Sequence, residues 1–88
     1  MVIPKRIEQL VTSPRALGAA LKRQRKIKKL NQTVVGSPFK LEQSTISSIE
    51  QGAKGTRLET LFRLLAALEL EMVIRPKIIK DLKDSEHW

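Results

Sequence analysis

Apolar residues recur with the period of an α-helix in four stretches of the chain. The first stretch opens with Ser13-Pro14, a serine N-cap followed by proline at the first helical position. The apolar positions that follow, and that keep a helical period to about Lys29, are Leu17, Ala20, Leu21 and Ile27. This pattern predicts a first helix over residues 14–29.

Two shorter helical patterns follow, joined by a turn of about four residues. The first, over 32–37, holds two adjacent valines that such a helix can bury. The second, over 43–51, places Ile46 and Ile49 three residues apart on one face. Its other face carries uncharged hydroxyl and amide groups, which can reach base edges and phosphates in a major groove. Together the two patterns predict a helix-turn-helix.

A fourth helix is predicted after a loop over 52–55. Thr56 and Glu59 form a capping box, in which each side chain satisfies a free backbone N–H of the first turn. The apolar stripe expected to face the core consists of Leu58, Leu61, Phe62, Leu65 and Leu68.

The period changes from helical to alternating at Leu70, Met72 and Ile74, and Pro76 ends the pattern. A single strand needs a partner, and a domain of 88 residues without cysteine has a small core and no disulfide support. Pairing with the same strand of a second copy meets both needs, so we expect a homodimer. The alternative is a segment that lies extended on its own core.

The net charge of +8 lies within residues 1–76, because residues 77–88 hold three cations and three acids. The densest group of cations consists of Lys22, Arg23, Arg25, Lys26, Lys28 and Lys29. Such a cluster favours an anionic partner, with nucleic acid ahead of acidic lipid, over a merely solvated helix face. The aromatic content of 3% leaves no stacking platform for single-stranded RNA.

The sequence contains no recognisable set of catalytic residues. There is no cysteine, and the only histidine, His87, stands beside the terminus, far from the serines of the motif. No cluster of acids has the spacing of a metal site, and no glycine loop is suited to cradle phosphate. We therefore expect no catalytic activity, no metal and no cofactor. The longest apolar run is too short to cross a membrane and no signal peptide is visible, so a cytoplasmic location is expected.

The central stretch resembles the family of phage-repressor and Xre-type regulators. The matching positions are Gln32, Ile46-Ser47, Ile49, Glu50 and Gly52, and the likeness covers about residues 13–74. The resemblance implies a mainly α, lambda-repressor-like helix-turn-helix bundle of four to five helices, with one C-terminal β-strand pairing across a homodimer. It also implies that Arg25 pairs with Glu50, where the alternative is an exposed Glu50.

In detail the chain is similar to the HipB-type antitoxins of that family. The shared features are Ser13-Pro14, Thr45-Ile46-Ser47, Leu68-Glu69-Leu70 and a tail that ends in Trp88. The likeness implies a bacterial, nucleoid-associated antitoxin that represses its own operon and neutralises a HipA-like toxin kinase, with Trp88 contributing to the toxin contact. A stand-alone Xre-type repressor without a toxin is the alternative. The expected organisation is an arm over 1–12, a DNA-binding and dimerisation domain over 13–76 and a flexible tail over 77–88.

The residues expected to contact a palindromic operator lie on the helix-turn-helix. Gln43 and Ser44 are best placed for base edges, and a base contact from Thr33 follows from its family position. Those expected to contact phosphate or nearby bases are Gln32, Lys40, Thr45, Ser47 and Ser48. Glu42 either accepts from cytosine N4 or is repelled by phosphate.

Four residues depart from the family pattern within the motif, and one of them is Glu42, which stands where the family has serine, threonine or lysine. Gly36 costs about 1 kcal/mol of helix propensity relative to alanine. Pro38 is expected to shorten or kink the second helix. Lys40 replaces the family's turn glycine, so it is strained if the turn requires a positive φ. These departures leave the predicted fold intact but make the operator sequence unpredictable.

Overall fold

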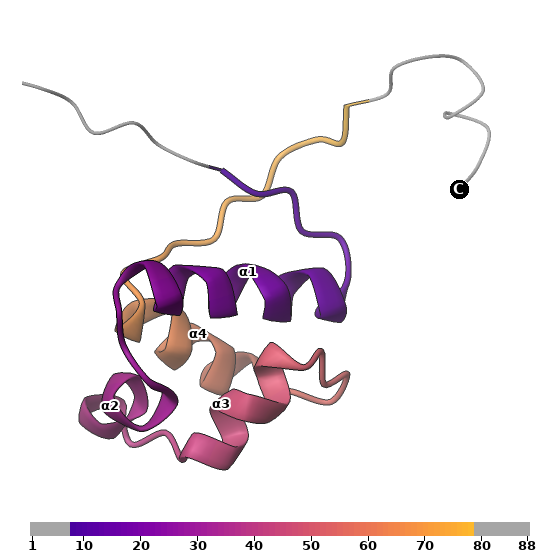
Figure 1. Ribbon diagram of the computed structural model, residues 1–88. Helices are drawn as coiled ribbons and strands as arrows, with labels where there is room; N and C mark the ends of the chain where they lie inside the picture. The colour runs from indigo at the N-terminus through magenta and orange to yellow at the C-terminus, as the bar shows by residue number, and fades with distance from the viewer. Residues whose placement is uncertain (1–7, 79–88) are drawn as a thin grey trace, which may run out of the picture.

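The computed structural model describes residues 8–78, which contain four α-helices. These are α1 (Pro14–Ile27), α2 (Gln32–Gly36), α3 (Gln43–Glu50) and α4 (Leu58–Ala67), with a 3-10 helix η1 (Ser37–Phe39) directly after α2. Helix α1 spans one side of the bundle, and α2 and α3 lie at the opposite end from the segments that lead to the two termini (Figure 1). The predicted mainly helical helix-turn-helix bundle is confirmed.

Nine buried aliphatic side chains, drawn from all four helices and the turn, form one core. They are Leu21, Val35, Leu41, Ile46, Ile49, Leu61, Leu64, Leu65 and Leu68. Helices α1 and α3 approach so closely that a Cβ added to Gly18 would lie 2.4 Å from the carbonyl oxygen of Ile49. Helix α3 therefore packs directly against the backbone of α1 at Gly18.

The start of α1 agrees with the sequence prediction. The Oγ of Ser13 accepts a hydrogen bond of 3.0 Å from the backbone N–H of Ala16, and Pro14 is the first helical residue. The helix ends at Ile27, two residues earlier than predicted, and Lys29 takes a positive φ of 57°. Asn31 caps α2 by accepting from the N–H of Val34 over 2.8 Å, a contact that the sequence analysis missed.

Three predicted core residues are exposed. Val35 is buried, whereas Val34 is 52% exposed; in α4, Leu58 is 68% and Phe62 is 52% exposed. Helix α4 buries a stripe at 61, 64, 65 and 68, which is also a regular helical spacing. Because α4 carries apolar residues on more than one face, the period alone does not identify the face that packs.

The predicted capping box at the start of α4 is wrong. Arg57 occupies the N-cap position, no side chain caps this end, and Thr56 lies one residue further out. Glu59 is consequently one position too early in the helix for the reciprocal bond, and its carboxylate instead pairs with Arg63 one turn later.

Residues 70–78 run without regular secondary structure, and no β-strand occurs within residues 8–78. Leu70 packs against the core, whereas Met72 and Ile74 are exposed. The segment follows the same side of α1 as the N-terminal segment (Figure 1), and Arg75 reaches Glu8 at 3.7 Å. A strand that pairs across a dimer needs a second chain, so the pairing stays a prediction. Trp88 lies outside the described residues.

Within the described residues, the helices are all too short or too polar to cross a membrane.

Candidate nucleic-acid interface

The turn between α2 and α3 is built by residues that depart from the family pattern. Helix α2 ends at Gly36 and gives way to η1, in which Pro38 lies in the first turn, as expected for a proline at this point. Lys40 then adopts left-handed backbone angles of φ 57° and ψ 41°. A non-glycine residue in this region costs on the order of 1–2 kcal/mol. The turn therefore does require a positive φ, and Lys40 is strained.

Gly36 allows the end of α2 to touch the turn. A Cβ at this position would lie 2.5 Å from the carbonyl oxygen of Leu41 and 2.6 Å from Cδ1 of Ile46. The N–H of Leu41 also donates to the carbonyl of Gly36 over 3.0 Å. Glycine is a poor helix former, but at this position any side chain would collide with Leu41 and Ile46. Only glycine therefore allows this close packing.

Arg25 and Glu50 form a buried, bidentate ion pair between α1 and the end of α3. Nε and Nη2 of Arg25 donate to the two carboxylate oxygens of Glu50 at 2.6 and 2.9 Å. Nη1 donates to the backbone carbonyl of Leu30 at 2.8 Å, just before the N-cap of α2. One guanidinium group therefore joins α1, the α1–α2 turn and α3, and the pair implied by the family resemblance is present.

Two glutamines extend this pair to the surface. Nε2 of Gln32, at the start of α2, donates to Oε1 of Glu50 over 3.1 Å. The Oε1 of Gln32 accepts a hydrogen bond from Nε2 of Gln43, at the start of α3. Gln43 itself is exposed. These hydrogen bonds connect the buried carboxylate of Glu50, through Gln32, to the exposed side chain of Gln43 at the start of α3.

The carboxyl group of Glu50 is held in its charged form. Burial alone raises its pKa, but the hydrogen bonds from Arg25 and Gln32 and the charges of Arg25 and Lys22 outweigh burial. The pKa of Glu50 therefore lies below its ordinary value, and the hydrogen bond to Glu50 raises the pKa of Arg25. A charged carboxylate is the form that accepts from both donors at once.

The remaining candidate contact residues surround the first turn of α3. Exposed among them are Thr33, Lys40, Glu42, Gln43, Ser44 and Ser48, while Gln32, Thr45 and Ser47 are half-buried. Glu42 is the N-cap residue of α3 but makes no capping hydrogen bond with its side chain. The Oγ of Ser47 accepts from Nε2 of Gln51 over 3.1 Å, so it is partly engaged within the helix. The exposed face is polar and available to a partner.

A hydroxyl-rich groove adjoins this face, between α3 and the start of α4. The polar residues that line it are Ser44, Thr45, Ser48, Thr56, Arg57 and Thr60. Hydroxyl and guanidinium groups are frequent phosphate ligands. Sequence reasoning found the serines of α3 but not Arg57, because only the fold brings the start of α4 beside them.

Residues 8–78 contain no group of three or more potential metal-binding side chains. Two of the six cations in the cluster form ion pairs within the protein, because Arg25 pairs with Glu50 and Lys28 with Glu69. The surface around the motif therefore offers hydrogen-bonding groups and positive charge, in the arrangement of a helix-turn-helix protein of the phage-repressor type.

Comparisons with known proteins identify the family within the helix-turn-helix proteins to which this chain belongs. No protein-family model matches the chain, and a search of curated proteins finds no match. Among solved structures, the HipB–O4 20mer complex is similar at 32% identity, with a TM-score of 0.74 over 78% of this chain and 97% of that chain. The HipA–HipB–O2–O3 complex gives 31% identity and a TM-score of 0.76 over 81% and 100% of the two chains. This chain belongs to the HipB family.

Proposed function

We propose that the chain is a dimeric, sequence-specific DNA-binding antitoxin that represses its own toxin–antitoxin operon. The observation that carries this proposal is the polar first turn of α3, exposed at Gln43 and held by the contacts through Gln32 to buried Glu50. The similar HipB structures are complexes with operator DNA, which supports the same ligand for this face. The proposed place of action is the nucleoid in the bacterial cytoplasm.

The proposed contacts divide by chemistry. Gln43 and Ser44 read base edges, with a further base contact from Thr33. The phosphate and nearby-base contacts come from Gln32, Lys40, Thr45, Ser47 and Ser48. Glu42, the exposed N-cap residue of α3, either accepts a hydrogen bond from cytosine N4 or repels phosphate close to the start of α3.

Dimerisation through the segment at Leu70, Met72 and Ile74 completes the proposal. Met72 is 47% and Ile74 is 92% exposed, and both are large apolar side chains that a second copy would cover. A two-fold dimer would bind a palindromic site with half-site centres about 34–36 Å apart. In this account residues 13–76 form the DNA-binding and dimerisation domain, preceded by an arm over 1–12.

We propose that the same dimer neutralises a HipA-like toxin kinase, with the tail over 77–88 and Trp88 contributing to the contact. One similar structure contains HipA together with HipB, which supports a kinase partner. DNA binding does not require Trp88, so a toxin contact through the tail is compatible with operator binding by the same dimer. The second candidate function is a stand-alone repressor, in which the tail has no partner.

The proposal is tested by selecting duplexes from a random pool with the full chain and then measuring affinity for the best sequence and for a scrambled duplex. We expect a palindromic selected duplex, bound at least a thousandfold more tightly than the scrambled one. Equal affinity for both duplexes would contradict sequence-specific repression.

The antitoxin function needs its own measurement. A HipA-like kinase would be co-purified with the full chain and with a copy truncated after Pro76. A stable complex with the full chain that weakens on truncation supports the antitoxin function. No complex with either copy, together with tight binding to the selected duplex, supports the stand-alone repressor.

A further inference from the structure

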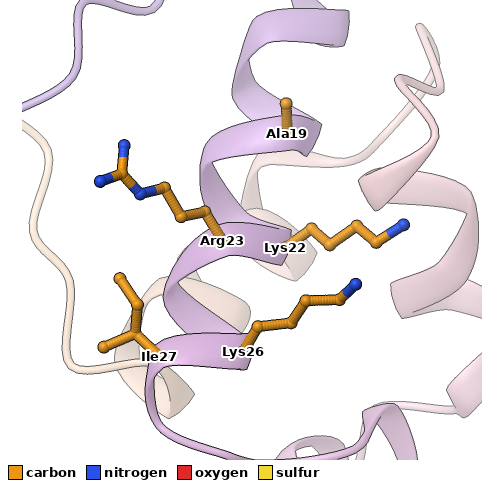
Figure 2. A pocket seen from close by; sticks show the side chains of 5 residues that line it. All are labelled: Ala19, Lys22, Arg23, Lys26 and Ile27. Atoms are coloured by element: carbon orange, nitrogen blue, oxygen red, sulfur yellow. The ribbon is translucent and has the colours of Figure 1, made fainter.

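Three exposed cations on α1, Lys22, Arg23 and Lys26, point in two directions. They line, with Ala19 and Ile27, an open hollow whose residues all come from this one helix. Figure 2 shows Lys22 and Lys26 extending to one side of the helix, while Arg23 and Ile27 point to the other side. A hollow formed by a single helix does not enclose a small ligand. Its two lysines and its arginine lie on opposite sides of the helix.

The lysine side of α1 is the side that faces the helix-turn-helix. The charge of Lys22 contributes to lowering the pKa of Glu50, so the ammonium group acts on the end of α3. Lys26 directly follows Arg25, whose guanidinium donates to the carbonyl of Leu30 beside the start of α2. Lys22 and Lys26 thus extend to the same side of α1 (Figure 2), and Lys26 lies in the last turn of the helix, next to the connection to α2.

The part of the chain that the structure describes supplies no counter-charge for these lysines. Within residues 8–78, Lys22, Arg23 and Lys26 have no carboxylate within 4.0 Å, whereas Glu50 and Glu69 are engaged by Arg25 and Lys28. Lys22 and Lys26 are also four residues apart, a spacing at which like charges on a helix repel each other. An anion bound between the two lysines would reduce this repulsion. The pair is therefore suited to bind a phosphate group.

We propose that Lys22 and Lys26 bind backbone phosphates that flank the half-site, on the strand that passes the start of α2, and that Arg23 does not. This inference rests on the proposed DNA-binding function and extends its footprint beyond the helix-turn-helix. Phosphate contacts carry no sequence information, so the two lysines contribute affinity and orientation rather than base preference. The apolar residues of the hollow take no part in the contact.

The salt dependence of DNA binding tests this directly, with the full chain, the Lys22→Gln/Lys26→Gln double variant and the matched Arg23→Gln control. Each phosphate contact that is lost lowers the slope of log K against log salt by about 0.9. We expect the double variant to lose about 1.8 in slope per protomer, with the same fold-loss on selected and scrambled duplexes. We expect Arg23→Gln to keep the wild-type slope, although it also removes a positive charge from α1.

A second probe locates the contact on the DNA. Methylphosphonate linkages would replace single phosphates outside the half-site of the selected duplex. We expect the wild-type chain to lose affinity at one or two of these linkages and the double variant to be insensitive to them.

Outcomes that overturn the inference are distinct from failure of the proposed function. A wild-type chain that binds no duplex overturns both. A wild-type chain that prefers the selected duplex, with the same slope in the double variant or an equal loss in Arg23→Gln, overturns the inference alone. Circular dichroism at each salt concentration shows that the variants are folded.

Discussion

Gln32, the first residue of α2, donates a hydrogen bond of 3.1 Å to Glu50, the last residue of α3. Because its side-chain oxygen also accepts from Gln43, Gln32 links both ends of the recognition helix. The angle between the two motif helices is thus fixed by polar contacts near the surface as well as by the apolar residues beneath them. In the proposed complex, these contacts present Gln43 in one orientation.

Replacing Gln32 by alanine is expected to weaken both the fold and DNA binding. The variant loses two side-chain hydrogen bonds, and we expect a loss of about 1 kcal/mol in the free energy of unfolding. Affinity for the selected duplex falls because Gln43 is no longer held. For the stability measurement Thr33→Ala is the matched control, since Thr33 is an exposed neighbour and such substitutions change stability by less than about 0.5 kcal/mol. Urea unfolding that gives equal stability for both variants would contradict the role assigned to Gln32.

Replacing Glu50 by glutamine is expected to cost far more. The change leaves the buried guanidinium of Arg25 without a charged partner, and breaking a buried pair in this way costs about 3–5 kcal/mol. In a domain of this size, such a loss lowers the midpoint of thermal unfolding by well over ten degrees. The measurement is thermal unfolding followed by circular dichroism, and a shift of only a few degrees would show that the pair contributes little.

The lowered pKa of Glu50 also predicts a pH dependence. A carboxyl group whose folded-state pKa is depressed stabilises the fold fully at pH values above its unfolded value, 4.5. This contribution is lost as the pH falls from about 4.5 through the lowered folded value. We expect the unfolding free energy of the wild type to decrease over this range, and that of Glu50→Gln to decrease less. The exposed Glu69, whose pKa Lys28 also lowers, provides the control Glu69→Gln, in which the decrease persists.

Gly36→Ala is expected to destabilise the protein although alanine is the better helix former. The new Cβ would meet the backbone oxygen of Leu41 at 2.5 Å, and a backbone atom cannot move aside without shifting the turn. Overpacking of this kind costs about 1–3 kcal/mol, which exceeds the propensity gain of about 1 kcal/mol. At Gly55 an added Cβ meets nothing within 4 Å, so Gly55→Ala is neutral or slightly stabilising. Denaturant unfolding of both variants checks this, and a stable Gly36→Ala would contradict the close contact.

Lys40→Gly is expected to separate stability from DNA binding. Glycine relieves the left-handed strain at φ 57°, so we expect the free energy of unfolding of the variant to be about 1 kcal/mol higher than that of the wild type. The same change removes a proposed phosphate contact and weakens binding to the selected duplex. Lys40→Ala removes the charge but keeps the strain, so it weakens binding without the gain in stability. Equal unfolding free energies for the two variants would show that the turn is not strained.

The sequence predicted the helical elements because their signals are local. Ser13-Pro14 and the spacing of Ile46 and Ile49 depend only on neighbouring residues, and the structure agrees with both. The sequence predicted strain at Lys40 on the condition that the turn requires a positive φ, and the φ of 57° meets that condition.

The parts that could not be predicted depend on contacts between distant residues. The orientation of α4 leaves Phe62 exposed because several apolar stripes were available to it. The contact of Gln32 with Gln43 spans eleven residues, and no periodicity reports it. The pairing of the C-terminal segment depends on a second chain, which neither the sequence pattern nor a single chain supplies.

Base reading by the first turn of α3 is tested by single-base substitutions in the selected duplex. Affinities of the wild type and of Gln43→Ala would be measured for every substitution in one half-site. We expect Gln43→Ala to lose about 1–3 kcal/mol on the selected duplex and to become indifferent to the base at one position while keeping its preferences elsewhere. An equal loss on all sequences, with every base preference retained, would contradict base reading by Gln43 and by the turn that presents it.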